Sequence, residues 1–514
     1  MQIRPIIGLV GVMLGVMMVE ANDQVVSFII DDVKGGFAIS HDPGTWIESL
    51  YLSGLAIGMT QGAWWSETVT QRGWIIFALS LACLTTLAIP SAPGVEALYG
   101  LRFVQGLAEG FTLPLLMEVA LAVLGPHIRL YGLCIYSMTV TFTPTVAVSW
   151  AALWGDLLDW QGQMYAALPL SLIPILLVLY GMPKGKPEYE RLHEYDWGGL
   201  LLGAPGIFAL TTMMYHGRRL DWFNSELICI LALVAAVCLP LFVLNELRHP
   251  CPLMDMRLFR RRNFTFPILS LFCFVIYTTS SHTVPVDYLA ETQYYRPIQA
   301  QAVTVVIALS QPVLLPLSAW ILNRRCVDAR IVMGTGVAMS IEACVLASYV
   351  TVIWNKEQFY LAQALQAVGQ ALTIMSLLMI VTNALRVEEG PGASAIVNTT
   401  RALAETASVW LIDLVEQWRG TLHYDRIVDQ VGRGRFATFQ AQTLKPHDPP
   451  PLLPDGLERF PGSLKLFATE MERQALALTT ADVFLVLAGV AAVVIVCLAV
   501  LPERTYPPRY VVTD

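Results

Sequence analysis

The side chains best suited to chemistry in this sequence are acids within long apolar segments. Glu20 and Asp23 stand three residues apart in one such segment, where no basic residue accompanies them. A charge at the centre of a bilayer costs about 2.5–3.5 kcal/mol on insertion scales, so it is retained for function or for pairing. A buried carboxylic acid can hold a proton near neutral pH, as a proton carrier must. We expect Glu20 and Asp23 to carry protons; the alternative is a purely structural role.

Two further sets of polar residues have the spacing i, i+3, i+7, which places each set on one face of a helix. They are Arg102, Gln105 and Glu109 in one segment, and Asn398, Arg401 and Glu405 in another. We expect them, with Asn22, to line a central cavity, and Glu405 to be a further proton carrier. The alternative is that Arg102 and Arg401 pair with acids and hold helices together. For Arg401 and Glu405, four residues apart, both interpretations stay open.

The sequence contains no recognised catalytic pattern. Its eight histidines are scattered without metal-ligand spacing, and nucleotide-binding glycine loops and the GxSxG nucleophile motif are missing. We therefore expect neither an enzyme nor a bound cofactor or metal. Any transport would be secondary rather than ATP-driven. The formal net charge of −8 also argues against nucleic acid as a partner.

The composition places these residues in a membrane protein. Of 514 residues, 55% are hydrophobic and only 14% are charged, with a mean hydropathy of +0.57. A soluble protein has about a quarter of its residues charged. About 20 apolar residues cross a bilayer as a helix, so we expect an all-α polytopic membrane protein with the lipid bilayer around it.

Fourteen apolar segments can be marked as transmembrane helices. They are 5–30, 45–65, 73–91, 97–123, 129–154, 160–182, 197–215, 225–245, 264–285, 299–322, 331–353, 359–385, 392–414 and 481–501. Lys and Arg gather in alternate connections, such as the run 257–262, which predicts that both termini are cytoplasmic. Tryptophans near segment ends, including Trp150 and Trp154, are interpreted as interface anchors.

A weak internal repeat suggests how the segments are grouped. Residues of the fourth and twelfth segments match at equal spacing: Tyr99, Gln105, Thr112 and Leu116 correspond to Tyr360, Gln366, Thr373 and Leu377. Parallel repeats of this kind build transporters from two six-helix bundles. We expect an N-terminal bundle over residues 1–182, two extra helices over 183–263 and a C-terminal bundle over 264–514.

The longest connection, residues 416–480, has helical flanks and a proline-rich middle. Leu464, Phe467 and Met471 recur at i, i+3, i+7, which gives the second flank an apolar stripe. We expect a helical hairpin outside the cytoplasm that binds a partner protein. A disordered loop is the alternative.

Several motifs resemble those of a known family. Residues 101–106 match the pattern RxxQG, and residues 392–401 match G-x-S-x-x-x-N-x-x-R. The fifth segment has Pro144 in place, but Ala147 and Ala151 stand where the family has glycines. The chain thus resembles the fourteen-span drug:proton antiporters of the major facilitator superfamily, of the EmrB/QacA type. Arg419, His423 and the long segment after them resemble the EmrB branch in particular.

The resemblance implies a secondary exporter of the bacterial inner membrane that works by alternating access. Its gate hinge would lie at Pro144, Ala147 and Ala151. Cargo, a small amphipathic organic compound, would leave in exchange for protons. A periplasmic adaptor protein would dock on Arg419, His423, Phe467 and Met471, and a TolC-type channel of the outer membrane would complete the path. The alternatives are a facilitator or importer of the same fold without proton antiport, and a non-transporting scaffold or receptor.

Overall fold

The structure, a computed structural model, is mainly helical in the residues that it describes. These are residues 3–123, 129–155, 157–386, 389–432, 457 and 461–501; for a few residues among them, including Asp23, only the backbone is described. No strand occurs within these ranges. The predicted all-α class is therefore confirmed.

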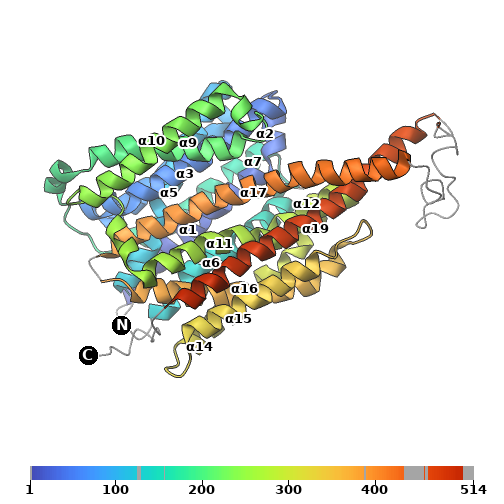
Figure 1. Ribbon diagram of the computed structural model, residues 1–514. Helices are drawn as coiled ribbons and strands as arrows, with labels where there is room; N and C mark the ends of the chain where they lie inside the picture. The colour runs from blue at the N-terminus through green and yellow to red at the C-terminus, as the bar shows by residue number, and fades with distance from the viewer. Residues whose placement is uncertain are drawn as a thin grey trace.

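Six long helices form an N-terminal bundle and six form a C-terminal bundle (Figure 1). The N-terminal bundle and its short helices are α1 (Ile3–Phe28), α2 (Ile30–Gly36), α3 (His41–Val69), α4 (Gln71–Ala88), η1 (Ile89–Ser91), α5 (Val95–Val123), α6 (Arg129–Gly155), α7 (Trp160–Tyr165) and α8 (Ala167–Gly181). The C-terminal bundle and its short helices are α11 (Arg262–His282), α12 (Val284–Gln293), α13 (Pro297–Ala300), η5 (Gln301–Val303), α14 (Val305–Leu322), α15 (Ala329–Ala347), α16 (Lys356–Asn383), α17 (Gly390–Gly432) and α19 (Ser463–Val500).

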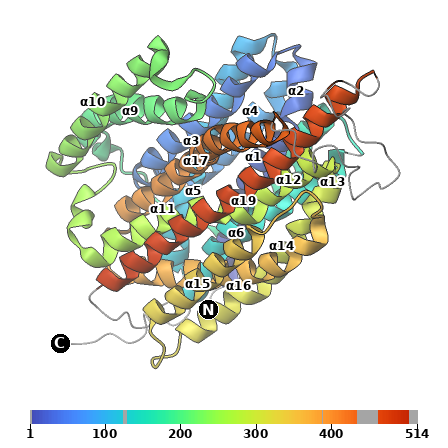
Figure 2. The ribbon, with the colours of Figure 1, turned by 45° about the vertical axis from the view of Figure 1, so that its right-hand side comes forward.

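Two long helices lie between the bundles in sequence and at the edge of the molecule in space (Figure 2). They and the neighbouring 3₁₀ turns are η2 (Tyr189–Glu194), α9 (Trp197–His216), η3 (Trp222–Asn224), α10 (Glu226–Arg248) and η4 (Met256–Arg260). Helix α9 packs on α3 and α17, and α10 packs on α9. The pair therefore adds to the outside of the two bundles without separating them.

The structure places a helix on each of the fourteen predicted segments, but the count of fourteen spans stays a prediction. Among the described residues, eleven helices are long and apolar enough to cross a membrane. The other three, α3, α5 and α17, contain many of the polar residues that the sequence singles out, and they pack on one another. Helices in the interior need less apolar surface than helices that face lipid.

Two ends of the molecule can be told apart in Figure 1. Helix α1 starts and α19 finishes at one end, which we call the terminus end. At the opposite end, the hairpin end, α17 and α19 run side by side well beyond the other helices. Both are longer than the predicted spans 392–414 and 481–501, because each continues without a break into the segment 416–480.

Glycines allow α3 and α5 to pack backbone against backbone. A Cβ atom added at Gly106 of α5 would overlap with the carbonyl oxygen of Tyr51 of α3, and one added at Gly54 would overlap with that of Phe103. Such contacts are typical of membrane helices that associate through small residues. They fix the distance between the two helices that bear most of the polar residues of the N-terminal bundle.

An ion pair near the terminus end joins two parts of the C-terminal bundle. Arg261, just before α11, binds both carboxylate oxygens of Glu389 at 2.6 Å and also the carbonyl oxygen of Ala384. Hydrogen bonds from the Arg261 guanidinium hold the pKa of the Glu389 carboxyl below its usual range. The pair thus anchors the connection from α16 to α17 on the start of α11.

Replacing Gly106 by alanine should destabilise the protein by about 1–3 kcal/mol, because the α3 backbone cannot move away without disturbing its other contacts. Gly100 is the matched control on the same helix, since a Cβ atom there would meet nothing within 4 Å. Thermal unfolding of the purified protein in detergent is the measurement. Equal melting temperatures for Gly106→Ala and Gly100→Ala would contradict the account.

Glu389→Gln should lower the melting temperature at pH 7, and the effect should shrink as the pH falls below the ordinary pKa of a glutamate and through the depressed pKa of Glu389. A carboxyl group whose pKa is depressed by folding stabilises the protein above its ordinary pKa, and this stabilisation is lost as the pH falls through the depressed value. The pair is partly exposed, so we expect at most about 1 kcal/mol. Glu190→Gln, in an exposed turn, is the control. A difference that persists unchanged at low pH would contradict the ionic origin.

Candidate functional site

A cavity of about 500 Å³ lies between the two bundles. Helices α1, α3, α5 and α6 contribute to its wall from one bundle, α11, α12 and α17 contribute from the other, and α9 adds one residue. Its acidic and basic lining residues are Glu20, Glu48, His282, Asp287, Arg401 and Glu405. Drug-sized ligands occupy pockets of about 300–1,000 Å³, so the volume fits one such molecule.

The centre of this cavity wall is an arginine between two acids. Arg401 of α17 lies 2.6 Å from the carboxylate of Glu20 of α1 and 3.1 Å from that of Glu405 on its own helix. The Arg401 side chain is only 4% exposed. Breaking a buried pair by removing one partner leaves an uncompensated charge, at a typical cost of 3–5 kcal/mol. The pair of Glu20 and Arg401 therefore holds α1 of one bundle to α17 of the other.

Towards the terminus end, uncharged groups close the gap between the bundles. Ser394 of α17 donates a hydrogen bond of 2.7 Å to the carbonyl oxygen of Pro114 in α5. Tyr136 of α6 donates one of 2.9 Å to the Asn398 side chain. Glu48 and Asp287, by contrast, line the cavity from the parts of α3 and α12 near the hairpin end. The lining of the cavity thus extends towards the hairpin end, and these two contacts between the bundles lie towards the terminus end.

A second polar cluster lies inside the N-terminal bundle around Glu109. Its carboxylate accepts hydrogen bonds from the Tyr51 hydroxyl, from Asn22 at 3.0 Å and from Gln105 at 3.3 Å. Arg102 donates to Gln105 at 2.8 Å, and its guanidinium lies 4.2 Å from the centroid of the Tyr51 ring. Tyr51 also lines the central cavity, so it connects this cluster with the cavity.

The structure therefore divides the predicted cavity residues into two groups. Asn22, Arg102, Gln105 and Glu109 meet in the cluster around Glu109, whereas Glu20, Arg401 and Glu405 meet at the cavity. Asn398 lies one turn from Arg401 and belongs to the contacts at the terminus end. The side chain of Asp23, the other predicted proton carrier, lies outside the described residues.

Neutral polar residues and one acid complete these groups without having been predicted. Tyr51 and Thr86 connect the cluster around Glu109, since Asn22 and Gln105 each donate to the Thr86 hydroxyl at 3.0 Å. Asp287 lines the cavity from α12, just beyond the predicted span 264–285. A tyrosine or threonine in an apolar segment has no distinctive pattern, whereas Asp287 could have been found by extending that segment.

The predicted hinge residues lie along α6. Pro144 is inside the helix and lines the central cavity, whereas Ala147 and Ala151 are buried. Ala147 faces a different pocket, on the other side of α6. Their hinge role stays a prediction.

The predicted docking residues on the hairpin have two different environments. Arg419 and His423 of α17 both bind the carboxylate of Asp482 of α19, at 2.5 Å and 2.6 Å. These two side chains therefore hold the helices of the hairpin together. Phe467 and Met471 are half-buried on α19. Across the described residues, no group of acids, histidines and cysteines is arranged to hold a metal ion.

Comparison with known proteins shows which family has this sequence pattern. Residues 12–404 match the Major Facilitator Superfamily. The probable multidrug resistance protein EmrY of Escherichia coli K12 is 24% identical over 93% of this chain and 91% of its own length. The multidrug export protein EmrB of Haemophilus influenzae is 25% identical over 80% of each chain. These names agree with the resemblance to the EmrB type.

Solved structures agree on the fold. The proton:xylose symporter XylE aligns with a TM-score of 0.58 over 98% of this chain and 97% of its own, at 13% identity. A transporter of the POT family aligns with a TM-score of 0.59 over 95% of each chain, at 13% identity. The two bundles around a central cavity and the match over most of the sequence lead to one conclusion: this chain is a multi-pass membrane transporter, not an enzyme, and it belongs to the Major Facilitator Superfamily.

Proposed function

We propose that this protein exports amphipathic organic compounds from the cytoplasm in exchange for protons, by alternating access between its two bundles. The observation that carries the proposal is the ion pair between Glu20 and Arg401, which crosses from one bundle to the other in the wall of a drug-sized cavity. The names of the relatives, multidrug resistance and multidrug export proteins, support the same class of cargo.

The proton would act by neutralising Glu20. While Glu20 is ionised, its attraction to Arg401 holds α1 and α17 together. Once Glu20 is protonated, Arg401 keeps Glu405 as a partner on its own helix, so α17 can move away from α1 without leaving its charge unpaired. Protonation of Glu20 would thus break the ion pair between the bundles, and Glu405 would limit the free-energy cost because it still pairs with Arg401.

The lining of the cavity suits a molecule with both apolar and polar parts. Apolar side chains such as Leu55 and Val275 share the wall with the ionisable groups around Arg401. A ligand near Arg401 would compete with the proton for Glu20, which is how an antiporter couples two opposite flows. Glu109 and Asp23 are further candidate proton carriers, and Arg102 with Gln105 would organise the cluster around Glu109.

A facilitator or importer of the same fold without proton antiport is the second candidate. The observation that favours it lies in α6, where Ala147 and Ala151 replace the glycines of the antiporters that the sequence resembles. Alanine still permits close packing but lacks the backbone freedom of glycine. Such a protein would move cargo down its own gradient irrespective of the pH gradient.

The length of the hairpin supports the proposal that a periplasmic adaptor docks on it. At about 1.5 Å per residue, the 43 residues of α17 reach roughly 65 Å, about twice the ~30 Å of the hydrocarbon layer. About half of α17 would therefore stand outside the membrane; Figure 1 shows this part of the helix extending beyond the other helices at the hairpin end. We propose that this end is periplasmic, with both termini cytoplasmic and the protein in the inner membrane, and that the adaptor leads to a TolC-type channel.

Glu20→Gln should abolish cargo movement driven by a pH gradient in proteoliposomes, while exchange of cargo at equal pH continues. Glutamine keeps the shape and can still accept a hydrogen bond from Arg401, but it cannot gain or lose a proton. Glu342→Gln, at an exposed position of α15, is the matched control. Asp23→Asn is tested beside it. Gradient-driven export at the wild-type rate in both the Glu20 and the Asp23 variant would refute the proton path. If the flux through the wild-type protein does not respond to the pH gradient, the protein is a facilitator rather than an antiporter.

Replacing residues 430–470 by a short Gly/Ser linker should separate transport from docking. The deletion leaves Arg419, His423 and Asp482 in place, so the base of the hairpin keeps its ion pairs. We expect transport in proteoliposomes to be retained, whereas co-purification with the adaptor and drug resistance of intact cells are lost. Full resistance together with retained adaptor binding would show that the hairpin is not the docking site.

A further inference from the structure

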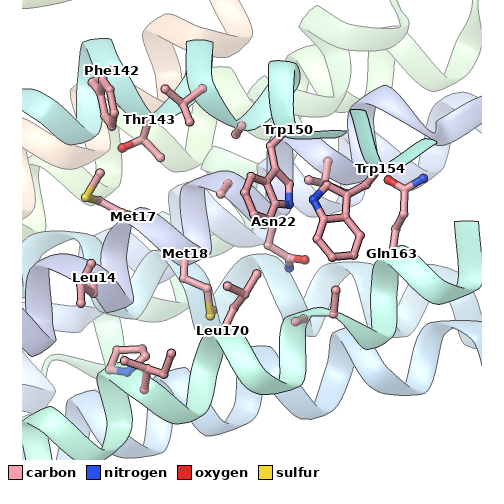
Figure 3. Close-up of a pocket in the computed structure, with 18 residues that line it drawn as sticks. Leu14, Met17, Met18, Asn22, Phe142, Thr143, Trp150, Trp154, Gln163 and Leu170 are labelled. Atoms are coloured by element: carbon pink, nitrogen blue, oxygen red, sulfur yellow. The ribbon is translucent and has the colours of Figure 1, made fainter. Parts of the chain in front are cut away.

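A second pocket lies on the side of α1 that faces away from the central cavity. It has a volume of about 310 Å³ and is enclosed by α1, α6, α7 and α8 (Figure 3). We call it the lateral pocket; Met17, Asn22, Trp150, Trp154 and Gln163 are among the residues that line it. The proton-coupled mechanism above assigns no ligand to this space, although Asn22 also donates to Glu109.

Helices α1 and α6 form the wall between the lateral pocket and the central cavity. On α1, Glu20 and Gln24 line the central cavity, whereas Met17 and Ala21 line the lateral pocket. On α6, Pro144 lines the central cavity, whereas Ala147 lines the lateral pocket. The two spaces are therefore separate sites on opposite faces of the same helices.

The lateral pocket differs from the central cavity in its chemistry. None of the described residues that line it is charged. Trp150 and Trp154 stack with their ring centroids 5.3 Å apart and form an aromatic wall. Such a lining suits an uncharged ligand with a large apolar surface.

The pocket also reaches the outer surface of the bundle. Trp150 is 45% exposed and Ile173 of α8 is 54% exposed, although both line the pocket. In a membrane protein, apolar side chains exposed on the outside of a helix bundle face lipid. A ligand would therefore enter from the bilayer, in which lipophilic compounds concentrate.

One polar atom in the pocket has no partner. The Oε1 atom of Gln163 is buried without a hydrogen bond among the described residues, and Gln163 as a whole is only 7% exposed. Figure 3 shows this oxygen turned towards Trp154. An unsatisfied buried acceptor costs about 1–3 kcal/mol, which a ligand with a matching donor would recover.

We propose that the lateral pocket binds uncharged lipophilic compounds that have a hydrogen-bond donor and that enter from the lipid phase. The apolar body of the ligand lies against Trp150 and Trp154, and its donor binds the Oε1 atom of Gln163. The proposal concerns binding alone, so its test is a binding measurement rather than a transport assay.

The probe is 4-octylphenol, and its methyl ether 4-octylanisole is the matched ligand that lacks the donor. Binding of tritiated 4-octylphenol to the full-length protein in lipid nanodiscs is measured by scintillation proximity, with empty nanodiscs to correct for partition into lipid. The ether serves as an unlabelled competitor. We expect the wild-type protein to bind the phenol about tenfold more tightly than the ether, because one hydrogen bond to a buried acceptor distinguishes the two.

Three variants locate the binding. Gln163→Leu should bring the affinity for the phenol down to that for the ether. Trp154→Ala should weaken both ligands and keep the tenfold preference, since the acceptor remains. Gln24→Leu removes an amide of the same type from the face of α1 that lines the central cavity, and it should leave both affinities unchanged.

Two results would overturn the proposal. If Gln163→Leu keeps the preference for the phenol, or if Gln24→Leu loses it, the donor is recognised elsewhere. If the wild-type protein binds phenol and ether equally, the pocket selects only apolar bulk, as it would if lipid tails filled it.

Discussion

One buried positive charge governs the arrangement of the two bundles. The guanidinium of Arg401 lies where helices of both bundles meet, and it is almost fully removed from solvent. Such a charge needs acids beside it, which come from two sources: Glu20 across the interface and Glu405 on the same helix. One partner lies on the same helix and the other on the opposite bundle, so neutralising Glu20 would remove this ionic contact between the bundles, while the packing of α3 on α17 and of α6 on α14 would remain.

The packing within the N-terminal bundle differs from the packing between the two bundles. Backbone contacts at Gly54 and Gly106 lock α3 to α5, so the polar cluster around Glu109 keeps a fixed geometry inside its bundle. Between the bundles, contacts such as those of Ser394 and Tyr136 are single hydrogen bonds between neutral groups. Each contributes about 1 kcal/mol and can be exchanged for others.

The sequence predicts the helices and the faces of polar residues well, but not the partners across the fold. Helical spacing placed Arg401 beside Glu405 and Gln105 beside Glu109, because neighbours on one helix follow from its period alone. It could not indicate that Glu20 meets Arg401, since that contact depends on how two bundles pack. Trp150 and Trp154 were interpreted as interface anchors, and only the position of α7 shows that they also line a pocket.

The uninterrupted course of α17 has a mechanical consequence. The sequence has no proline in this helix after Pro391, so it lacks the commonest cause of a kink between the cavity and the hairpin end, and the helix is continuous there. Residues 401–432 alone span roughly 45 Å, at about 1.5 Å per residue. A tilt of a few degrees at Arg401 thus becomes a displacement of several ångströms at the far end, and the ion pairs of Asp482 make α19 follow. The hairpin is therefore a rigid extension of the interface between the bundles, and any tilt of α17 is enlarged at its far end.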